Sequence, residues 1–160
     1  MCGICGFTGE IITRGALQQV VIERMADAIT HRGPDDCGYH VEEDIAMGFR
    51  RLSIIDVEGA PQPLYNEDKS LVLMFNGEIY NYRELRAELQ GLGHVFYTHS
   101  DSEVLVHGFE EWGEKMLDRL RGMFGFAIWN RVTKELFVAR DFFGIKPMHY
   151  AMVGDNFVYG

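Results

Sequence analysis

Several features are scarce in this sequence, and each shortage excludes a class of protein. No apolar run approaches the ~20 residues that a membrane-spanning helix requires. No cluster of Lys and Arg occurs, and the net charge of −9 opposes binding to a phosphate backbone. Repeats, linkers and low-complexity segments are also missing. We therefore expect a protein that uses neither a membrane nor a nucleic acid as its partner.

Cysteine is scarce as well, with three residues in a chain of 160. An odd number of cysteines, without an apolar leader, favours a reducing cytoplasm over secretion. Cys2 and Cys5 form a Cys-x-x-Cys motif, which is half of a metal site or a redox pair. No second pair completes zinc ligation, because the remaining cysteine is the isolated Cys37. We expect a cytoplasmic protein without a metal site.

The composition, 47% apolar and 24% charged, is that of one globular domain with a substantial core. Apolar spacing predicts helices at 17–29, 82–92, 103–112 and 116–120. It predicts strands at 3–9, 39–41, 45–49, 52–56, 71–75, 95–98, 124–129, 136–139, 148–153 and 157–159. Two helical zones among many short strands favour an α+β domain with stacked antiparallel sheets and helices outside. The chain stops inside an expected strand, so we expect a fragment.

The strongest chemical signal is Cys2, directly after Met1. If Met1 is removed, this one residue carries both a thiol and a free α-amine. The thiol is a weak nucleophile at its reference pKa of about 8.5, but an α-amine with a pKa of about 7.7–8 can accept its proton. Cys2 could therefore supply both nucleophile and base. A cysteine at this position could equally be accidental.

Four other patches have both a chemical and a structural interpretation. Arg50-Arg51 could be a surface pair, and Asn76-Gly77-Glu78 could be a tight turn, since Asn-Gly is common in hairpins. Asp101 lies in Ser100-Asp101-Ser102-Glu103, which fits a helix-capping box. The segment His31-Arg32-Gly33-Pro34-Asp35 could simply end a helix. Each patch alone is a weak indication of function.

Taken together and in order, these patches resemble a known family. The matching blocks are Met1 to Gly6, His31 to Asp35, Arg51-Leu52-Ser53-Ile54-Ile55-Asp56, Gln62-Pro63-Leu64, Asn76 to Asn81, Ser100 to Glu103 and Arg140 to Pro147. The sequence resembles the class II glutamine amidotransferase domain, an N-terminal-nucleophile hydrolase, and more narrowly the N-terminal domain of glutamine-hydrolysing asparagine synthase. The resemblance implies a four-layer αββα sandwich of two stacked antiparallel sheets.

The resemblance also implies roles for individual residues. Cys2 would attack the side-chain amide of glutamine and form a thioester. The side chain of Asn76 and the backbone N–H of Gly77 would form the oxyanion hole. Arg51 would bind the α-carboxylate of glutamine, and Glu78 and Asp101 would bind its α-ammonium. Leu52, Ile54 and Ile55 would line the rest of the pocket.

The implied partners are glutamine and a synthetase domain, which receives ammonia for an asparagine-synthase reaction on aspartate or on another acceptor. That domain, with its Ser-Gly-Gly-x-Asp-Ser loop, is not in this sequence. We therefore expect no cofactor in residues 1–160, because ATP and Mg belong to the synthetase domain. Homo-oligomerisation stays open.

Two alternatives compete with the enzyme. One is a glutamine-binding or regulatory module that retains Met1 and never exposes the amine of Cys2. The other is a redox protein that uses Cys2 and Cys5, although Arg51, Asn76 and Asp101 would then have no purpose.

Overall fold

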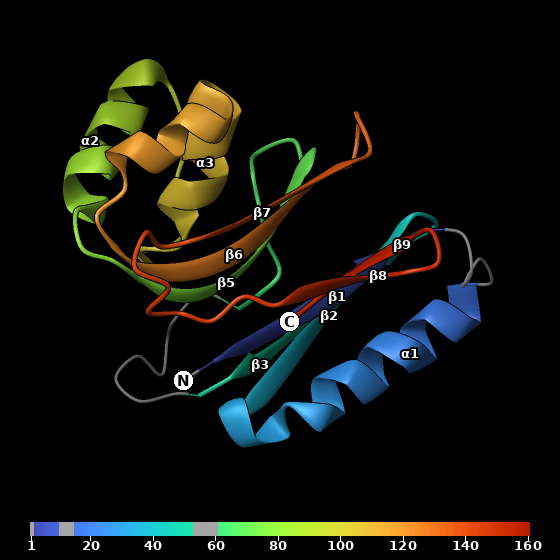
Figure 1. The fold of residues 1–160 in the computed structure, drawn as a ribbon. Coiled ribbons are helices and arrows are strands. Elements are labelled where there is room, and N and C mark those ends of the chain that lie inside the picture. The colour runs from blue at the N-terminus through green and yellow to red at the C-terminus, as the bar shows by residue number, and fades with distance from the viewer. Residues whose placement is uncertain (1, 10–14, 53–60) are drawn as a thin grey trace. The chain divides into compact units, whose positions relative to one another are not determined.

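The computed structural model describes residues 2–9, 15–52 and 61–160, and it divides into two compact units. One unit is Met1–Val57 with Pro147–Gly160, and the other is Glu58–Lys146. Each has one antiparallel sheet with helices packed against it (Figure 1). Across the described ranges, no helix is both long and apolar enough to cross a bilayer.

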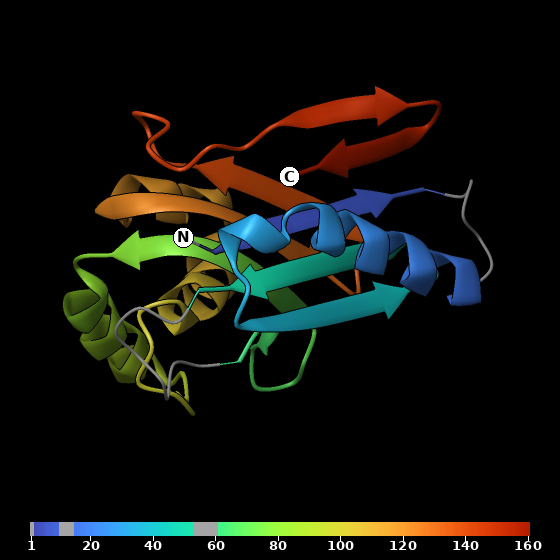
Figure 2. The same ribbon diagram turned by 90° about the horizontal axis from the view of Figure 1, so that it is seen from below.

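The first unit is a five-stranded sheet in the order β2-β3-β1-β9-β8. Its helix α1 runs across β1, β2 and β3 (Figure 2). Ile22 and Ala26 of α1 are buried against Phe7 of β1 and Ala46 of β3. The elements are β1 (Gly3–Thr8), α1 (Gly15–Ala28), η2 (Thr30–Arg32), β2 (Asp36–Glu42), β3 (Ile45–Arg51), β8 (Tyr150–Val153) and β9 (Asn156–Tyr159).

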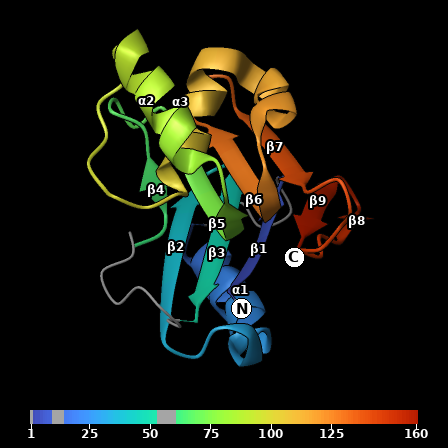
Figure 3. The same cartoon turned by 90° about the vertical axis from the view of Figure 1, so that its left-hand side faces the viewer.

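The second unit is a four-stranded sheet in the order β4-β5-β6-β7, with α2 and α3 beside each other (Figure 3). Leu73, Phe75 and Ile79 of β5 belong to the core that Leu89 of α2 and Leu105 of α3 complete. The elements are β4 (Leu64–Tyr65), β5 (Leu71–Ile79), α2 (Tyr82–Leu92), α3 (Glu103–Trp112), η3 (Gly113–Arg119), β6 (Gly122–Asn130) and β7 (Glu135–Arg140).

Most of the predicted elements are confirmed. The apolar run at 71–75 is a strand, and consecutive buried residues from Leu71 to Asn76 show that both of its faces are covered. The helix at 82–92 ends where predicted, because Gly93 adopts the left-handed conformation with φ of 107°. The piece predicted at 116–120 is the 3-10 helix η3. Of the strand predicted at 52–56, Leu52 is irregular and residues 53–56 lie outside the described residues.

The strand predicted at 95–98 is wrong, because this segment is irregular. Its backbone donors bind carboxylates instead of a neighbouring strand. The N–H of Val95 donates to Glu67 Oε1 at 2.8 Å, and the N–H groups of Tyr97 and Thr98 donate to Glu103 Oε1 and Oε2 at 2.7 and 2.8 Å. These contacts satisfy the backbone without a sheet.

The helix predicted after Ser100 is confirmed as α3, but its capping box is not formed. The N-cap Ser102 has helical backbone angles and makes no side-chain capping bond. Glu103 reaches back to Tyr97 and Thr98 rather than to the N-cap. The carboxylate of Asp101 accepts the N–H of Ile79 at 2.7 Å. Asp101 therefore anchors β5, and its interpretation as a helix cap is wrong.

Candidate active site

Cys2 lies immediately before β1 and is partly exposed. Its thiol is directed toward the carbonyl oxygen of Leu52, with a distance of 4.0 Å from Sγ to oxygen. β1 pairs with β3 so that Gly3 is opposite Arg50. The end of β3 therefore lies alongside Cys2.

Two glycines allow the chain to pack closely around Cys2. A Cβ on Gly3 would lie 2.9 Å from Ile29 Cδ1 and 3.2 Å from Arg32 Cβ. A Cβ on Gly33 would lie 2.5 Å from the carbonyl carbon of Arg50 and 2.6 Å from that of Arg51. The segment at 31–35 does end a helical turn, as predicted, but it also packs against the strand ends that carry Cys2 and Arg51.

Cys5 cannot act with Cys2 as a redox pair in this structure. Cys2, Cys5 and Cys37 are all free thiols. Cys5 is buried within the core under α1, and burial raises the pKa of its thiol to about 12. Residues three apart on an extended strand point to opposite faces, which separates the two side chains. The geometry opposes the redox interpretation.

The two arginines of the Arg50-Arg51 pair differ in environment. The Nε of Arg50 donates to the carbonyl of Ala26 at 3.1 Å, and its guanidinium forms an ion pair with Asp27. Arg50 thus ties β3 to α1. Arg51 is the last residue of β3 and is half-buried, and its carbonyl accepts the N–H of Asp35 at 3.0 Å.

Asn76, Gly77 and Glu78 lie inside β5, opposite Gly125, Phe124 and Met123 of β6. The interpretation of this segment as a tight turn is therefore wrong. Position 77 requires glycine, because a Cβ there would lie 2.2 Å from the carbonyl oxygen of Met123. Close approach of two backbones, rather than a turn, explains the glycine.

The pleat of β5 determines where these three residues point. Leu73, Phe75 and Ile79 face the core under α2 and α3. By alternation, Asn76 and Glu78 point to the opposite face of the sheet.

The backbone N–H and C=O groups of Gly77 point away from β6, toward the edge of β5 that pairs with β4. Groups on alternate residues of a strand share one edge. On this edge the side chain of Gln62 accepts the N–H of Phe75 at 2.6 Å and donates to its carbonyl at 2.9 Å. The N–H of Ile79 binds Asp101 on the same edge. β4 pairs with β5 only at Val72 and Leu73, so it does not reach Gly77. The N–H of Gly77 therefore points outward from the strand, between Gln62 and Asp101.

Burial raises the pKa of the Asp101 carboxyl, and the negative charge of Glu78 raises it further. The N–H of Ile79 acts in the opposite direction but does not outweigh them. A cation beside Asp101 would favour the charged form of its carboxyl. The Glu78–Asp101 pair is therefore suited to an ammonium group.

Asp141 directly follows β7, and its side chain binds the backbone of the neighbouring strand β6. It is buried, and its carboxylate accepts the N–H groups of Phe124, Ile145 and Lys146 at 3.2, 2.9 and 2.9 Å. Burial acts to raise the pKa of Asp141, but these backbone bonds lower it overall. Phe124 is the residue opposite Gly77, so Asp141 stabilises the strand against which Gly77 packs.

Comparison with known proteins identifies the family. Residues 1–160 match a family model described as a glutamine amidotransferase domain. The chain belongs to this family. Asparagine synthetase [glutamine-hydrolyzing] 1 of Bacillus subtilis is 48% identical over 157 residues, covering 98% of this chain and 25% of the relative. The asparagine synthetase [glutamine-hydrolyzing] of Zea mays is 43% identical, covering 99% of this chain and 27% of the relative. This amidotransferase domain thus spans about a quarter of the length of these relatives.

Solved structures show the same fold. The glutamine phosphoribosylpyrophosphate amidotransferase of B. subtilis matches 99% of this chain and 41% of its own, with a TM-score of 0.77 at 23% identity. An allosteric regulatory enzyme of purine biosynthesis matches the same shares with a TM-score of 0.79 at 23% identity. The amidotransferase domain therefore shares the fold of these two enzymes, and the predicted α+β class with two antiparallel sheets is confirmed.

The predicted site residues fall into two groups, one in each unit of the amidotransferase domain. Cys2, Arg51 and Leu52 belong to the first unit. Asn76, Gly77, Glu78 and Asp101 belong to the second, where β5 and its contact with Asp101 bring them together. Ile54 and Ile55 lie outside the described residues. Sequence reasoning assigned no role to the Gln62 side chain, and the signal available was its position in the block Gln62-Pro63-Leu64.

Proposed function

We propose that this domain hydrolyses glutamine to glutamate and ammonia, with Cys2 as the nucleophile, and supplies the ammonia to the synthetase region of an asparagine synthetase acting on aspartate. The observation that carries this proposal is the match to three B. subtilis asparagine synthetases at 40–48% identity over at least 98% of the chain. The names of these relatives include glutamine hydrolysis.

In the proposed reaction, removal of Met1 gives Cys2 a free α-amine. This amine accepts the thiol proton, and the thiolate attacks the side-chain carbonyl carbon of glutamine. The tetrahedral intermediate collapses, the C–N bond breaks and ammonia leaves with a proton from the amine. Water then attacks the thioester, releasing glutamate and restoring the thiol. The partial exposure of Cys2 supports this role, whereas Cys5 is buried.

The oxyanion of both tetrahedral intermediates would be stabilised by the side-chain amide of Asn76 and the backbone N–H of Gly77. The outward direction of that N–H, between Gln62 and Asp101, supports this assignment. One such donor contributes about 2.7–4 kcal/mol to lowering a barrier of this kind. Because both donors are held on a buried strand, no reorganisation accompanies the developing charge.

The α-amino and α-carboxylate groups of glutamine need charges of both signs. Arg51 offers a planar guanidinium that can bind the α-carboxylate through two parallel hydrogen bonds. Glu78 and Asp101 offer negative charge for the α-ammonium, and the raised pKa of Asp101 reflects burial first and then its neighbour Glu78. Leu52, Ile54 and Ile55 complete the proposed pocket. ATP and Mg would act in the synthetase region, outside these 160 residues.

The test of the proposal is the Cys2→Ala variant, with Cys37→Ala as a matched control at an exposed thiol. Cys2→Ala should abolish ammonia release from glutamine while the circular dichroism spectrum stays unchanged. Cys37→Ala should keep full activity. A glutamine-like diazo-ketone should label Cys2 alone, as peptide mass spectrometry can show. Turnover in Cys2→Ala, or labelling at another cysteine, would refute the nucleophile assignment.

Intact-mass measurement of the same sample distinguishes the enzyme from a binding module. The enzyme requires loss of Met1. A chain that retains Met1, binds glutamine and releases no ammonia would support the binding module instead.

A further inference from the structure

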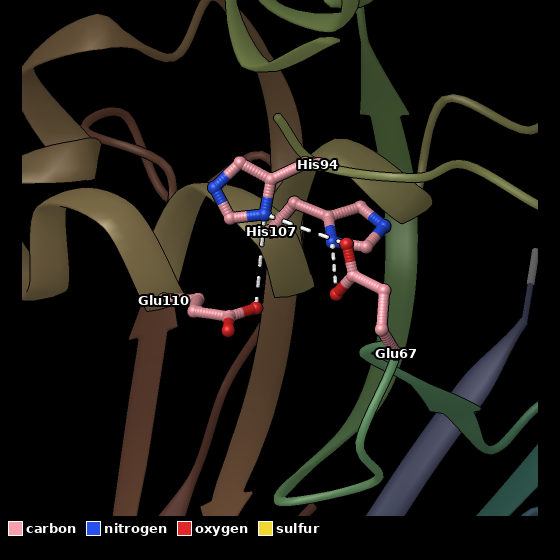
Figure 4. Close-up of side chains that lie close together, drawn as sticks. All are labelled: Glu67, His94, His107 and Glu110. Atoms are coloured by element: carbon pink, nitrogen blue, oxygen red, sulfur yellow. Dashed lines mark ion pairs between the residues drawn. The ribbon is translucent and has the colours of Figure 1, made fainter. Parts of the chain in front are cut away.

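Four side chains that the proposed function does not use converge at one edge of the second unit. Glu67 follows β4, His94 follows α2, and His107 and Glu110 lie one helical turn apart on α3 (Figure 4). Their ligand atoms all lie within 4.8 Å of one another. A depression of about 360 Å³ opens there, and Glu67, His94 and Glu110 line it.

One ring nitrogen of His107 is buried and makes no hydrogen bond. The residue is fully buried, and its Nδ1 makes no hydrogen bond. That atom points toward Glu67, with 3.3 Å between Nδ1 and Oε2 (Figure 4). A buried polar atom of this kind normally has a partner.

Both imidazoles present the same nitrogen to the cluster. Nδ1 of His94 lies 3.7 Å from Glu67 Oε1 and 3.8 Å from Glu110 Oε2. Each Nε2 faces a carboxylate of α3 instead: that of His94 lies 3.2 Å from Glu111, and that of His107 lies 3.4 Å from Glu103. When Nε2 carries the ring proton and donates it in a hydrogen bond to the carboxylate, Nδ1 has a lone pair directed at the cluster. This pairing of a carboxylate with the outer nitrogen is typical of metal-bound histidine.

The carboxylates of the cluster are also oriented by the protein. Glu67 accepts the N–H of Val95 at 2.8 Å, and Glu110 accepts the side-chain amide of Asn66 at 3.2 Å. These two bonds hold the carboxylates of Glu67 and Glu110 beside the histidines.

The carboxylates around the two histidines favour binding of a cation. Glu67, Glu103, Glu110 and Glu111 place four carboxylates around two imidazoles. The guanidinium of Arg86 lies 3.8 Å from Glu103, and Arg86 does not line the depression.

We propose that Glu67, His94, His107 and Glu110 form a binding site for a divalent transition-metal ion of the zinc class. Two imidazole nitrogens and two carboxylate oxygens suit Zn²⁺, whereas Mg²⁺ and Ca²⁺ prefer oxygen ligands. Tetrahedral bonds of about 2.0–2.2 Å place ligand atoms roughly 3.3–3.6 Å apart. The separations of 3.3, 3.7 and 3.8 Å approach this range, and Glu67 and Glu110 are exposed enough to adjust.

The bound ion would join three segments that are distant in sequence. Glu67 belongs to the β4–β5 connection, His94 begins the irregular segment at 94–100, and the other two ligands belong to α3. That irregular segment leads directly to Asp101, which binds Ile79 of β5. The ion thus has a structural role, holding the segment that leads to a proposed glutamine-binding residue.

The test is Zn²⁺ titration of the metal-free 160-residue chain by calorimetry, with Co²⁺ absorption to report tetrahedral coordination. One equivalent should bind. His94→Asn and Glu110→Gln should each weaken binding at least tenfold, and these partly exposed positions spare the fold better than His107 does. His99→Asn, a matched control on the same segment, and Glu114→Gln, an exposed carboxylate on η3, should match the wild type within twofold.

Two results would overturn the proposal. One is the absence of saturable Zn²⁺ binding. The other is unchanged binding in His94→Asn and Glu110→Gln with loss of binding in a Cys2→Ala, Cys37→Ala double variant, which would place the ion on the thiols.

Discussion

The side chain of Gln62 makes the hydrogen bonds to β5 that a neighbouring strand would otherwise make. The variant Gln62→Ala tests how much these bonds stabilise the domain. The substitution removes two hydrogen bonds, at 2.6 and 2.9 Å, from the backbone of Phe75. Phe75 is 4% exposed and directly precedes Asn76, so its N–H and carbonyl lose their partners in a buried setting.

The expected cost follows from these two bonds. Each contributes about 0.5–1.5 kcal/mol net, and a buried donor left unsatisfied costs about 1–3 kcal/mol. Gln62 is itself only half-buried, so water can reach part of the vacated space. We expect the free energy of unfolding to fall by roughly 1–3 kcal/mol.

Urea denaturation measures this loss as a lower midpoint with an unchanged slope. Gln90→Ala, at an exposed position of α2, is the control and should change stability by less than about 0.5 kcal/mol. Since β5 also carries the proposed oxyanion donors, kcat should fall more than KM rises. A stability loss in Gln62→Ala no larger than in the control would refute this account of Gln62.

Three further substitutions test other parts of the structure. Gly77→Ala should lower the thermal midpoint measurably, because a Cβ would lie 2.2 Å from the carbonyl oxygen of Met123; Gly91→Ala, where nothing lies within 4 Å, should not. Asp141→Asn should cost roughly 2–3 kcal/mol in urea, because its amide would face the N–H groups of Phe124 and Lys146. The lowered pKa of Asp141 means that its contribution is complete above its ordinary value of 3.8 and is lost as pH falls further, so the wild-type advantage over Asp141→Asn should shrink in acid. Arg51→Lys should raise KM for glutamine by about tenfold with little change in kcat, because an ammonium cannot form the paired bonds of a guanidinium; Arg24→Lys, on the exposed side of α1, should leave KM unchanged.

Sequence reasoning succeeded where the signal is local. The continuous apolar run at 71–75 predicted β5, and Gly93 predicted the end of α2, because each depends on neighbours along the chain. The α1 face was less well predicted, since Leu17 and Val20 are exposed while Gln18 is buried. Gln18 is accommodated by a hydrogen bond to the distant carbonyl of Glu43, which spacing could not reveal.

The failures share the same physical origin. The segment at 95–98 has the composition of a strand, but carboxylates 5 to 28 residues away along the chain bind its N–H groups. Asn76-Gly77 reads locally as a turn, yet pairing with β6 holds it in a strand. The proposed metal ligands come from three separate segments. Only His107 and Glu110, three residues apart on a predicted helix, have a spacing that predicts neighbouring side chains.

The fully buried carboxylate of Glu103 has a consequence for how the amidotransferase domain fluctuates. It accepts hydrogen bonds from two backbone N–H groups and from the hydroxyl of Thr98, all in the irregular segment at 94–100. Moving this segment away would break all three bonds together and leave a buried carboxylate without these donors. We expect the segment to open as a single cooperative unit rather than to fray residue by residue. We therefore expect hydrogen exchange to show the amides of Tyr97 and Thr98 as well protected, although they lie in neither a strand nor a helix.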